Sequence, residues 1–179
     1  MKKIDFTYLP SLVNDKFYPL FFDKHRYLIL WGGAGSSKSV STAQKLVYRV
    51  IKEEGHRILC LRKVARTSRE STFALIKGII GQWGLTKYFR INRSDMTITY
   101  KPNGSMFLFA GVDDVEKLKS IYDVTSEWLE EASEFEENDF TQLDLRLRGE
   151  TKYYKQIIIS FNPILESHWL NSHFFKSKV

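Results

Sequence analysis

The sequence has little that could form covalent cross-links or cross a membrane. Cys60 is the only cysteine among its 179 residues, so no internal disulfide can form, which favours a reducing cytoplasm. Because Cys60 lies in an apolar run, we expect its side chain to be buried in the core and to pack as a small hydrophobic residue. No apolar stretch approaches the roughly 18 residues of a membrane-spanning helix, and the first residues lack the apolar core of a signal peptide. The histidines have no zinc-like spacing with a cysteine. We therefore expect neither membrane association nor structural zinc.

What is present is a basic, globular composition. Hydrophobic residues make up 43% of the chain and aromatic residues 15%, which excludes a disordered protein and suits one domain with a sizeable core. The formal net charge of +6 permits nucleic-acid binding without requiring it. A basic cluster directly follows a predicted strand and contains Arg62, Lys63, Arg66 and Arg69. Contact with a phosphate backbone and a plain solvated face are both open for this cluster.

The most informative stretch is Gly32-Gly-Ala-Gly-Ser-Ser-Lys-Ser39. An apolar run precedes it and a helical pattern follows it, which is the arrangement of a phosphate-binding loop, the Walker A motif of P-loop NTPases. Glycines let successive backbone N–H groups turn inward, and the N-terminus of the following helix adds positive potential. Lys38 is then predicted to reach the β- and γ-phosphates of a nucleotide, and Ser39 to hold Mg²⁺.

One position departs from the usual loop pattern. Ser37 stands where the second glycine is expected, and a small residue is tolerable there if its φ stays negative. The alternative is a glycine-rich turn followed by Lys-Ser by chance. The strand before the turn and the helix after it favour the phosphate loop. Its binding residues would be Gly32, Gly33, Ala34, Gly35, Ser36, Ser37, Lys38 and Ser39.

Strand and helix signals alternate along the rest of the chain. Apolar runs predict strands at 27–31, 57–61, 123–129 and 156–161. Helical spacing predicts helices at 39–54, 67–84, 113–120 and 168–175, the second beginning with a capping box at Thr67. Asn103-Gly104 between two further runs predicts an antiparallel hairpin. The aromatic-rich residues 1–26 are predicted to pack across the core. The fold class is therefore α/β, a P-loop NTPase with a mostly parallel central sheet, an antiparallel hairpin and helices on both faces.

A pair of adjacent acids forms the second half of the predicted site. Glu130 and Glu131 follow the run Glu127-Trp-Leu129. A phosphate loop needs an acid from another strand to complete the Mg²⁺ shell, and hydrolysis needs a carboxylate that activates water. We assign Glu130 to the metal shell, through water, and Glu131 the role of the general base or of the residue that orients the attacking water. A surface acidic helix is the alternative, because further acids follow.

With these residues in place, the chain resembles the N-terminal ATPase domain of the large terminase subunit, the DNA-packaging motor of tailed bacteriophages. The resemblance rests on the phosphate loop, Trp128-Leu-Glu-Glu-Ala132, Leu145-Arg-Leu-Arg-Gly149 and Ser160-Phe-Asn-Pro163, in that order, and spans about residues 26–165. It implies that Ser160 and Asn162 form a coupling motif beside the γ-phosphate. An arginine often present within the relatives' loop is replaced here by Ala34. Arg146 and Arg148 could neutralise transition-state charge or form structural ion pairs; both remain open.

The resemblance also implies a biological setting. It predicts a Mg²⁺-dependent ATP hydrolase that packages double-stranded viral DNA into a procapsid in the host bacterial cytoplasm. Portal protein, the small terminase subunit and a homo-oligomeric ring are the implied partners. Residues 1–179 would be the P-loop ATPase domain, with the C-terminal nuclease domain outside this chain and no nuclease activity expected. The alternatives are a small-molecule P-loop kinase or a catalytically weak DNA-binding assembly module. A GTPase is disfavoured because no Asn-Lys-x-Asp motif is present.

Overall fold

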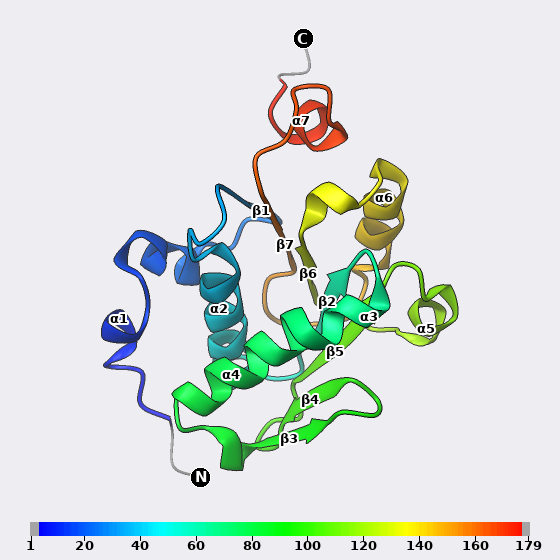
Figure 1. Ribbon diagram of the computed structural model, residues 1–179. Helices are drawn as coiled ribbons and strands as arrows, with labels where there is room; N and C mark the ends of the chain where they lie inside the picture. The colour runs from blue at the N-terminus through cyan, green and yellow to red at the C-terminus, as the bar shows by residue number, and fades with distance from the viewer. Residues whose placement is uncertain (1–3, 177–179) are drawn as a thin grey trace.

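A computed structural model describes residues 4–176 and shows a central sheet between two layers of helices (Figure 1). The sheet has seven strands in the order β1-β7-β6-β2-β5-β4-β3. The first five strands in that order run parallel, and β4 and β3 are added antiparallel at the β5 edge. The strands are β1 (Tyr27–Trp31), β2 (Arg57–Arg62), β3 (Phe89–Asn92), β4 (Thr97–Tyr100), β5 (Met106–Gly111), β6 (Ser126–Glu130) and β7 (Gln156–Phe161). The predicted α/β class and mostly parallel sheet are confirmed.

The helices follow the predicted alternation closely. They are α1 (Leu9–Leu12), α2 (Lys38–Lys52), α3 (Ala65–Ser68), α4 (Ala74–Gln82), α5 (Val115–Ser120), α6 (Glu137–Arg146) and α7 (Trp169–Phe174). Among them, α6 was not predicted from the sequence. None of the helices within residues 4–176 combines the length and the hydrophobicity of a membrane span.

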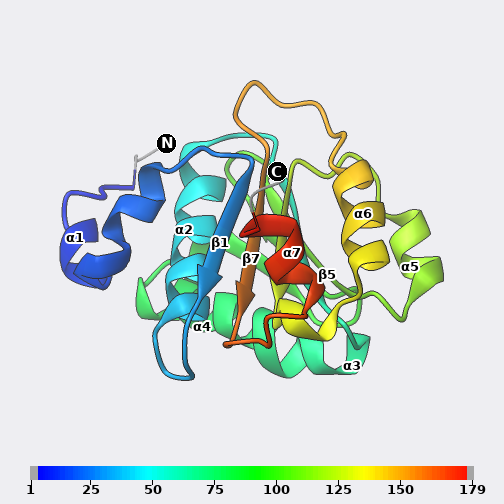
Figure 2. The ribbon, with the colours of Figure 1, turned by 90° about the horizontal axis from the view of Figure 1, so that it is seen from above.

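Alternation along the strands divides the core between the two faces of the sheet. On β2, Ile58 and Cys60 pack in a cluster with α2 and α4, whereas Leu59 and Leu61 pack in a second cluster with α5, α6 and α7. Figure 2 shows the two helical layers on either side of the sheet. Cys60 is fully buried, as predicted, and burial raises the pKa of its thiol well above the ordinary value. Helices on both faces are thereby confirmed.

The predicted hairpin is present, but the antiparallel part of the sheet is larger than predicted. Strands β4 and β5 pair around a turn at Asn103-Gly104, where Gly104 has a φ of 76°. Strand β3 pairs with β4 in turn and forms the edge of the sheet. Its sequence, Phe-Arg-Ile-Asn, alternates between apolar and polar residues, but four residues are the minimum length at which such a pattern indicates a strand. Strand β3 therefore extends the sheet by one strand beyond the predicted hairpin.

The capping box predicted at Thr67 is wrong. The helical segment begins earlier, at Ala65, and runs through a π-helical turn, Arg69–Phe73, into α4. The Ala65 N–H donates to Asp113 Oδ1 at 2.7 Å, so the cap comes from the far end of β5. The Thr67 hydroxyl instead donates to the Val64 carbonyl. A long-range carboxylate thus replaces the local cap that the sequence pattern favoured.

The N-terminal segment lies beside α2, and Ile4, Phe17 and Leu20 pack against the core on that face of the sheet, as predicted. Leu9, Val13 and Phe21 form a small cluster of their own against Tyr48 of α2. The Lys45 ammonium donates to the carbonyls of Leu20 and Asp23, both at 2.6 Å. Burial, aided by the charge of the neighbouring Arg49, lowers the pKa of Lys45 to about 7. Apolar packing and the buried Lys45 amine therefore hold the segment against α2. Figure 1 shows the segment beside that helix.

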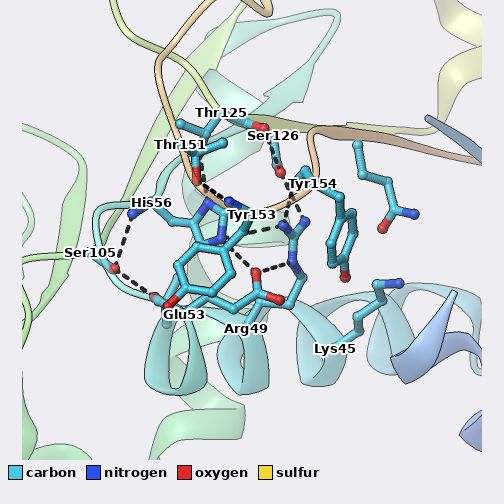
Figure 3. A network of polar contacts seen from close by, with 12 residues as sticks. Lys45, Arg49, Glu53, His56, Ser105, Thr125, Ser126, Thr151, Tyr153 and Tyr154 are labelled. Carbon is cyan, nitrogen blue, oxygen red and sulfur yellow. Dashed lines mark hydrogen bonds and ion pairs between the residues drawn. The ribbon is translucent and has the colours of Figure 1, made fainter. Parts of the chain in front are cut away.

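A buried polar network ties the distal end of α2 to the amino ends of the strands (Figure 3). Arg49, 1% exposed, donates to the Glu53 carboxylate at 2.9 Å, to Ser126 Oγ at 2.9 Å and to the Tyr154 carbonyl at 2.8 Å. His56 Nε2 lies 2.6 Å from the same Glu53 carboxylate. Burial alone would raise the pKa of Glu53, but the hydrogen bond from His56 and the charge of Arg49 bring it below the ordinary value. The network thereby fixes the direction of α2 relative to the sheet.

We expect Arg49→Met to destabilise the protein by about 3–5 kcal/mol, because it removes the guanidinium partner of the partly buried Glu53 carboxylate and leaves the Tyr154 carbonyl without its donor. Urea denaturation measures this directly. The matched control is Arg90→Met on β3, an exposed arginine whose loss should change the free energy of unfolding by less than about 0.5 kcal/mol. Equal stabilities of the two variants would show that the network contributes nothing.

Glu127 is an acid on the face of β6 that packs toward α6. It is fully buried, and neither carboxylate oxygen has a hydrogen-bond partner among the described residues. Burial, with a further contribution from the Asp144 charge, raises the pKa of Glu127 well above the ordinary value, while Arg146 and Arg26 oppose the rise. The folded state therefore keeps this proton to a higher pH than the unfolded state does.

The raised pKa of Glu127 makes the free energy of unfolding depend on pH. Above about pH 4.3, the unfolded chain has released the Glu127 proton while the folded chain retains it, so stability falls as pH rises. We expect Glu127→Gln to flatten this fall and to be more stable than the parent at pH 7–8, with the two converging near pH 4. Chemical denaturation at several pH values measures it. A difference between the two proteins that does not change with pH would contradict the assignment.

Candidate nucleotide site

The glycine-rich loop connects β1 to α2 at the carboxyl edge of the sheet. In Figure 2 the arrowheads of β1 and β7 point to the same end of the molecule, where this loop and the segments after β6 and β7 meet. Gly35 has a φ of 76°, and Ser37 has a φ of 66°. The condition of a negative φ at Ser37 is therefore not met: the serine adopts the left-handed conformation that glycine occupies without strain. The predicted loop is otherwise present, and α2 begins at Lys38.

The Lys38 side chain lies within this loop. Its ammonium donates to the carbonyls of Gly32 at 2.7 Å and Gly33 at 3.0 Å, to Ser36 Oγ at 3.1 Å and to Asn162 Oδ1 at 3.3 Å. Lys38 is only 8% exposed, so these four acceptors satisfy an amine that is nearly removed from water. The contact to Asn162 joins the loop to the end of β7.

Ser39 and Glu130 meet as predicted. The Ser39 hydroxyl donates to Glu130 Oε1 at 2.5 Å, and the Ser160 hydroxyl donates to the other oxygen of the same carboxylate. Burial raises the pKa of Glu130 above its ordinary value, and the Glu131 charge contributes to the rise; the two serine hydroxyls and Arg62 oppose it. Ser160 also accepts from the indole N–H of Trp128 at 2.8 Å. The predicted coupling residue therefore orients the predicted metal-side acid.

Glu131 turns toward the loop because the backbone bends sharply after β6. Its φ of 55° and ψ of 52° place it in the left-handed region, which brings two consecutive carboxylates to one side of the strand end. The side-chain amide of Asn162 donates to Glu131 Oε2 at 3.3 Å while its oxygen accepts from Lys38. Backbone strain of this kind is concentrated at functional sites. The acid pair is thus part of the site, and the alternative of an outward acidic helix is wrong.

Two supports of the site were not predicted from sequence. The segment after Glu131 is held by α7, where the Trp169 indole donates to the Phe135 carbonyl at 2.6 Å and His168 Nε2 lies 3.1 Å from the Ser133 carbonyl. Arg62, at the end of β2, contacts Glu134 at 3.4 Å. The aromatic residues within 168–175 were the sequence signal available for this support. They do not show that Trp169 binds the Phe135 carbonyl, 34 positions earlier in the chain.

Arg146 and Arg148 lie at the opposite edge of the sheet from the loop. The Arg146 guanidinium donates to the Leu118 carbonyl at 2.9 Å, and the adjoining Gly149 N–H donates to the carbonyl of Val124, just before β6 begins. Neither arginine is positioned to complete the loop of its own chain. The interaction observed for Arg146 is structural.

The donor set at the loop fits a hard cation beside phosphates. Ser39 Oγ and Glu130 Oε1 are oxygen ligands of the type that Mg²⁺ prefers. Within residues 4–176 no three His, Cys, Asp or Glu side chains gather as a metal-binding cluster. Ser39 and Glu130 would supply two of the oxygen ligands of a cation bound at the loop.

The sequence comparisons agree with this geometry. A family model described as phage terminase large subunit matches residues 24–178. The PBSX phage terminase large subunit of Bacillus subtilis strain 168 is 38% identical over 168 residues, covering 93% of this chain and 38% of that protein. The large subunit of Bacillus phage SPP1 is 30% identical over 135 residues, covering 69% of this chain and 32% of that protein. The chain therefore spans about a third of the length of the curated relatives it matches.

The structural comparison points to the same fold. The large terminase of a thermophilic bacteriophage superposes with a TM-score of 0.71 at 17% identity, covering 86% of this chain and 38% of that one. The ATPase domain of the Thermus phage P74-26 large terminase gives a TM-score of 0.57 at 16% identity, covering 85% of this chain and 70% of that one. At this identity the agreement concerns the arrangement of strands and helices.

The left-handed serine gives a prediction for stability. Ser37 caps no backbone N–H with its side chain, so replacing it with glycine loses no cap and relieves the strain of a positive φ. We expect Ser37→Gly to stabilise the protein by about 1 kcal/mol, a rise of about 2–4 °C in the melting temperature for a domain of this size. The control is Ala34→Gly in the same loop, where φ is not positive and the melting temperature should not rise. Equal shifts in both variants would contradict the assignment of strain to Ser37.

Proposed function

The chain belongs to the phage terminase large subunit family, and from that premise we propose that it is the Mg²⁺-dependent ATPase domain of a DNA-packaging motor. In this function, hydrolysis of ATP drives double-stranded viral DNA into a procapsid. The observation that carries the proposal is the Asn162 amide, which contacts the Lys38 ammonium with one end and the Glu131 carboxylate with the other. The large terminase of the same thermophilic bacteriophage has been solved with ATP-gamma-S and with ADP, which supports a nucleotide as the ligand of this fold.

The residues of the loop bind and orient the triphosphate. The backbone N–H groups of residues 32–39 and the N-terminus of α2 attract the phosphates. Lys38 exchanges its contacts with the Gly32 and Gly33 carbonyls for the β- and γ-phosphate oxygens. Ser39 and Glu130 would hold Mg²⁺, which would neutralise phosphate charge when bound. Glu130 would then be ionised beside the cation, although burial alone raises its pKa.

Glu131 orients the attacking water and accepts its proton. Its left-handed backbone aims the carboxylate across the strand end toward the place where Lys38 would hold the γ-phosphate. Asn162 contacts both residues, so loss of the γ-phosphate changes the partners available to its side chain. Because Asn162 directly follows β7, that change is passed to the chain leading into α7. In this way Ser160 and Asn162 couple the state of the nucleotide to the position of neighbouring elements.

The setting of the whole protein is part of the proposal. The motor would act in the host bacterial cytoplasm on double-stranded DNA, together with the portal protein and the small terminase subunit. A ring of identical subunits would allow Arg146 or Arg148 to act on a neighbouring subunit, since neither lies at the loop of its own chain. Inorganic phosphate released to water without an acceptor distinguishes this function from that of a kinase.

Two substitutions test the roles of the reacting groups. We expect Lys38→Ala to lower the rate of phosphate release at least about 100-fold and to weaken ATP binding, because it removes the cation from the phosphates. Glu131→Gln should preserve ATP binding while lowering the rate about 10²- to 10⁴-fold, because the water loses its base. Phosphate release and binding of a fluorescent ATP analogue measure the two effects separately.

Matched controls are available on α5, a helix that contributes no residue to the proposed nucleotide site. Lys119→Ala and Glu116→Gln make the same chemical changes at exposed positions and should leave both measurements unchanged. Normal turnover by Glu131→Gln would remove it as the base. Normal ATP binding and turnover by Lys38→Ala would remove the loop as the nucleotide site and the proposed function with it.

A further inference from the structure

A basic hollow lies beside the nucleotide site, at the same carboxyl edge of the sheet. It has a volume of about 290 Å³ and is lined by residues of α3, the π-helical turn, the end of β5 and α5, together with Met96. Figure 1 shows α3 near the end of β5, with α5 beside them. Met96, Phe109 and Ala110 contribute its apolar lining, and its polar lining comes from Arg66, Arg69, Glu70 and Lys117. None of these residues belongs to the catalytic machinery proposed above.

The structure divides the basic cluster that follows β2 into two parts. Arg62 contacts Glu134 at 3.4 Å, and Lys63 contacts Asp139 at 2.6 Å, so both are used within the fold. Arg66 and Arg69 form no ion pair with any described residue and line the hollow. The sequence alone could not make this distinction.

A third cation joins the two arginines from a distant part of the chain. Lys117 of α5 lines the same hollow. Partial burial lowers the pKa of Lys117, and the charge of Arg69 acts in the same direction, whereas Asp114 and Asp95 oppose it. Three cations are thus held close together with Glu70 as the one acid in the lining. Such an arrangement costs electrostatic energy that an anionic ligand would recover.

The hollow is rigid enough to hold this arrangement. The start of α3 is fixed to the end of β5 by the Ala65 N–H, which donates to Asp113 at 2.7 Å. A Cβ atom at Gly111 would collide with the backbone of Ala65, so the two elements approach closely only because Gly111 has no side chain. The strand β2 links this region to the nucleotide site, because it pairs in parallel with β6, the strand that ends at Glu130.

We propose that Arg66, Arg69 and Lys117 form a contact site for the phosphate backbone of double-stranded DNA. The arginines are exposed, which suits a polyanion lying across the surface and disfavours an enclosed small ligand. Arginine and lysine side chains that contact phosphates bind without reading base sequence. The inference rests on the proposed function and deepens it: the two arginines follow β2, which pairs with β6, the strand that ends at the metal-side acid.

Binding of a mixed-sequence duplex, measured by fluorescence anisotropy at several salt concentrations, tests the site. For Arg66→Ala/Arg69→Ala/Lys117→Ala we expect weaker binding and a slope of log K against log salt that is smaller by up to about 2.7, since each phosphate contact contributes about 0.9. The control triple, Lys16→Ala/Lys24→Ala/Lys52→Ala, removes the same charge from exposed positions on the opposite flank. Its slope should remain close to that of the parent.

The outcomes separate this inference from the proposed function. A parent chain that binds duplex DNA but releases no phosphate from ATP would refute the function and leave the contact site intact. ATP hydrolysis without DNA should be equal in the parent and both triples. The contact site would be refuted if the slope of log K against log salt fell equally in the two triple variants, or in neither of them. It would also be refuted if the parent chain failed to bind duplex DNA at low salt. If the alanine triple does not fold, Arg66→Gln/Arg69→Gln/Lys117→Gln provides the same comparison with side-chain volume retained.

Discussion

The whole candidate site depends on the hydrogen bonds that Asn162 makes across the carboxyl edge of the sheet. Its amide lies between Lys38, which follows β1, and Glu131, which follows β6. These contacts exist only because β7 pairs with β1 on one side and β6 on the other. The strand order therefore brings together segments that are far apart in sequence, such as Ser39 and Glu130, which are separated by 91 positions. Ligands in open α/β sheets bind at such an edge.

Two strained residues flank this edge, and buried structure holds both. Ser37 and Glu131 have left-handed backbones, each costing about 1–2 kcal/mol for a residue with a Cβ atom. Ser37 precedes α2, which is fixed at its other end by the Arg49 network. Glu131 follows β6, a strand buried along its full length. Rigid elements on either side thus maintain conformations that would relax in an isolated loop.

The local parts of the fold could be predicted from sequence, and the long-range parts could not. Apolar runs and a glycine-rich turn identified β1, the loop and α2, and Asn103-Gly104 identified the hairpin, because those signals lie within a few residues of one another. The left-handed φ of Ser37 and the cap of α3 by Asp113 depend on contacts outside that range. For the site, the sequence was enough to identify the two acids, Glu130 and Glu131. Only the structure shows that Ser160 binds Glu130 and that Asn162 joins Lys38 to Glu131.

A crystal structure of this chain with Mg²⁺ and a non-hydrolysable ATP analogue is the most direct test of the account. We expect the γ-phosphate to lie between the Lys38 ammonium and the Glu131 carboxylate, with the metal on the side of Ser39 and Glu130. The Lys38 contacts to the Gly32 and Gly33 carbonyls should then be replaced by contacts to phosphate oxygens. A nucleotide bound elsewhere on the domain, or bound at the loop with Glu130 and Glu131 turned away from it, would contradict the account.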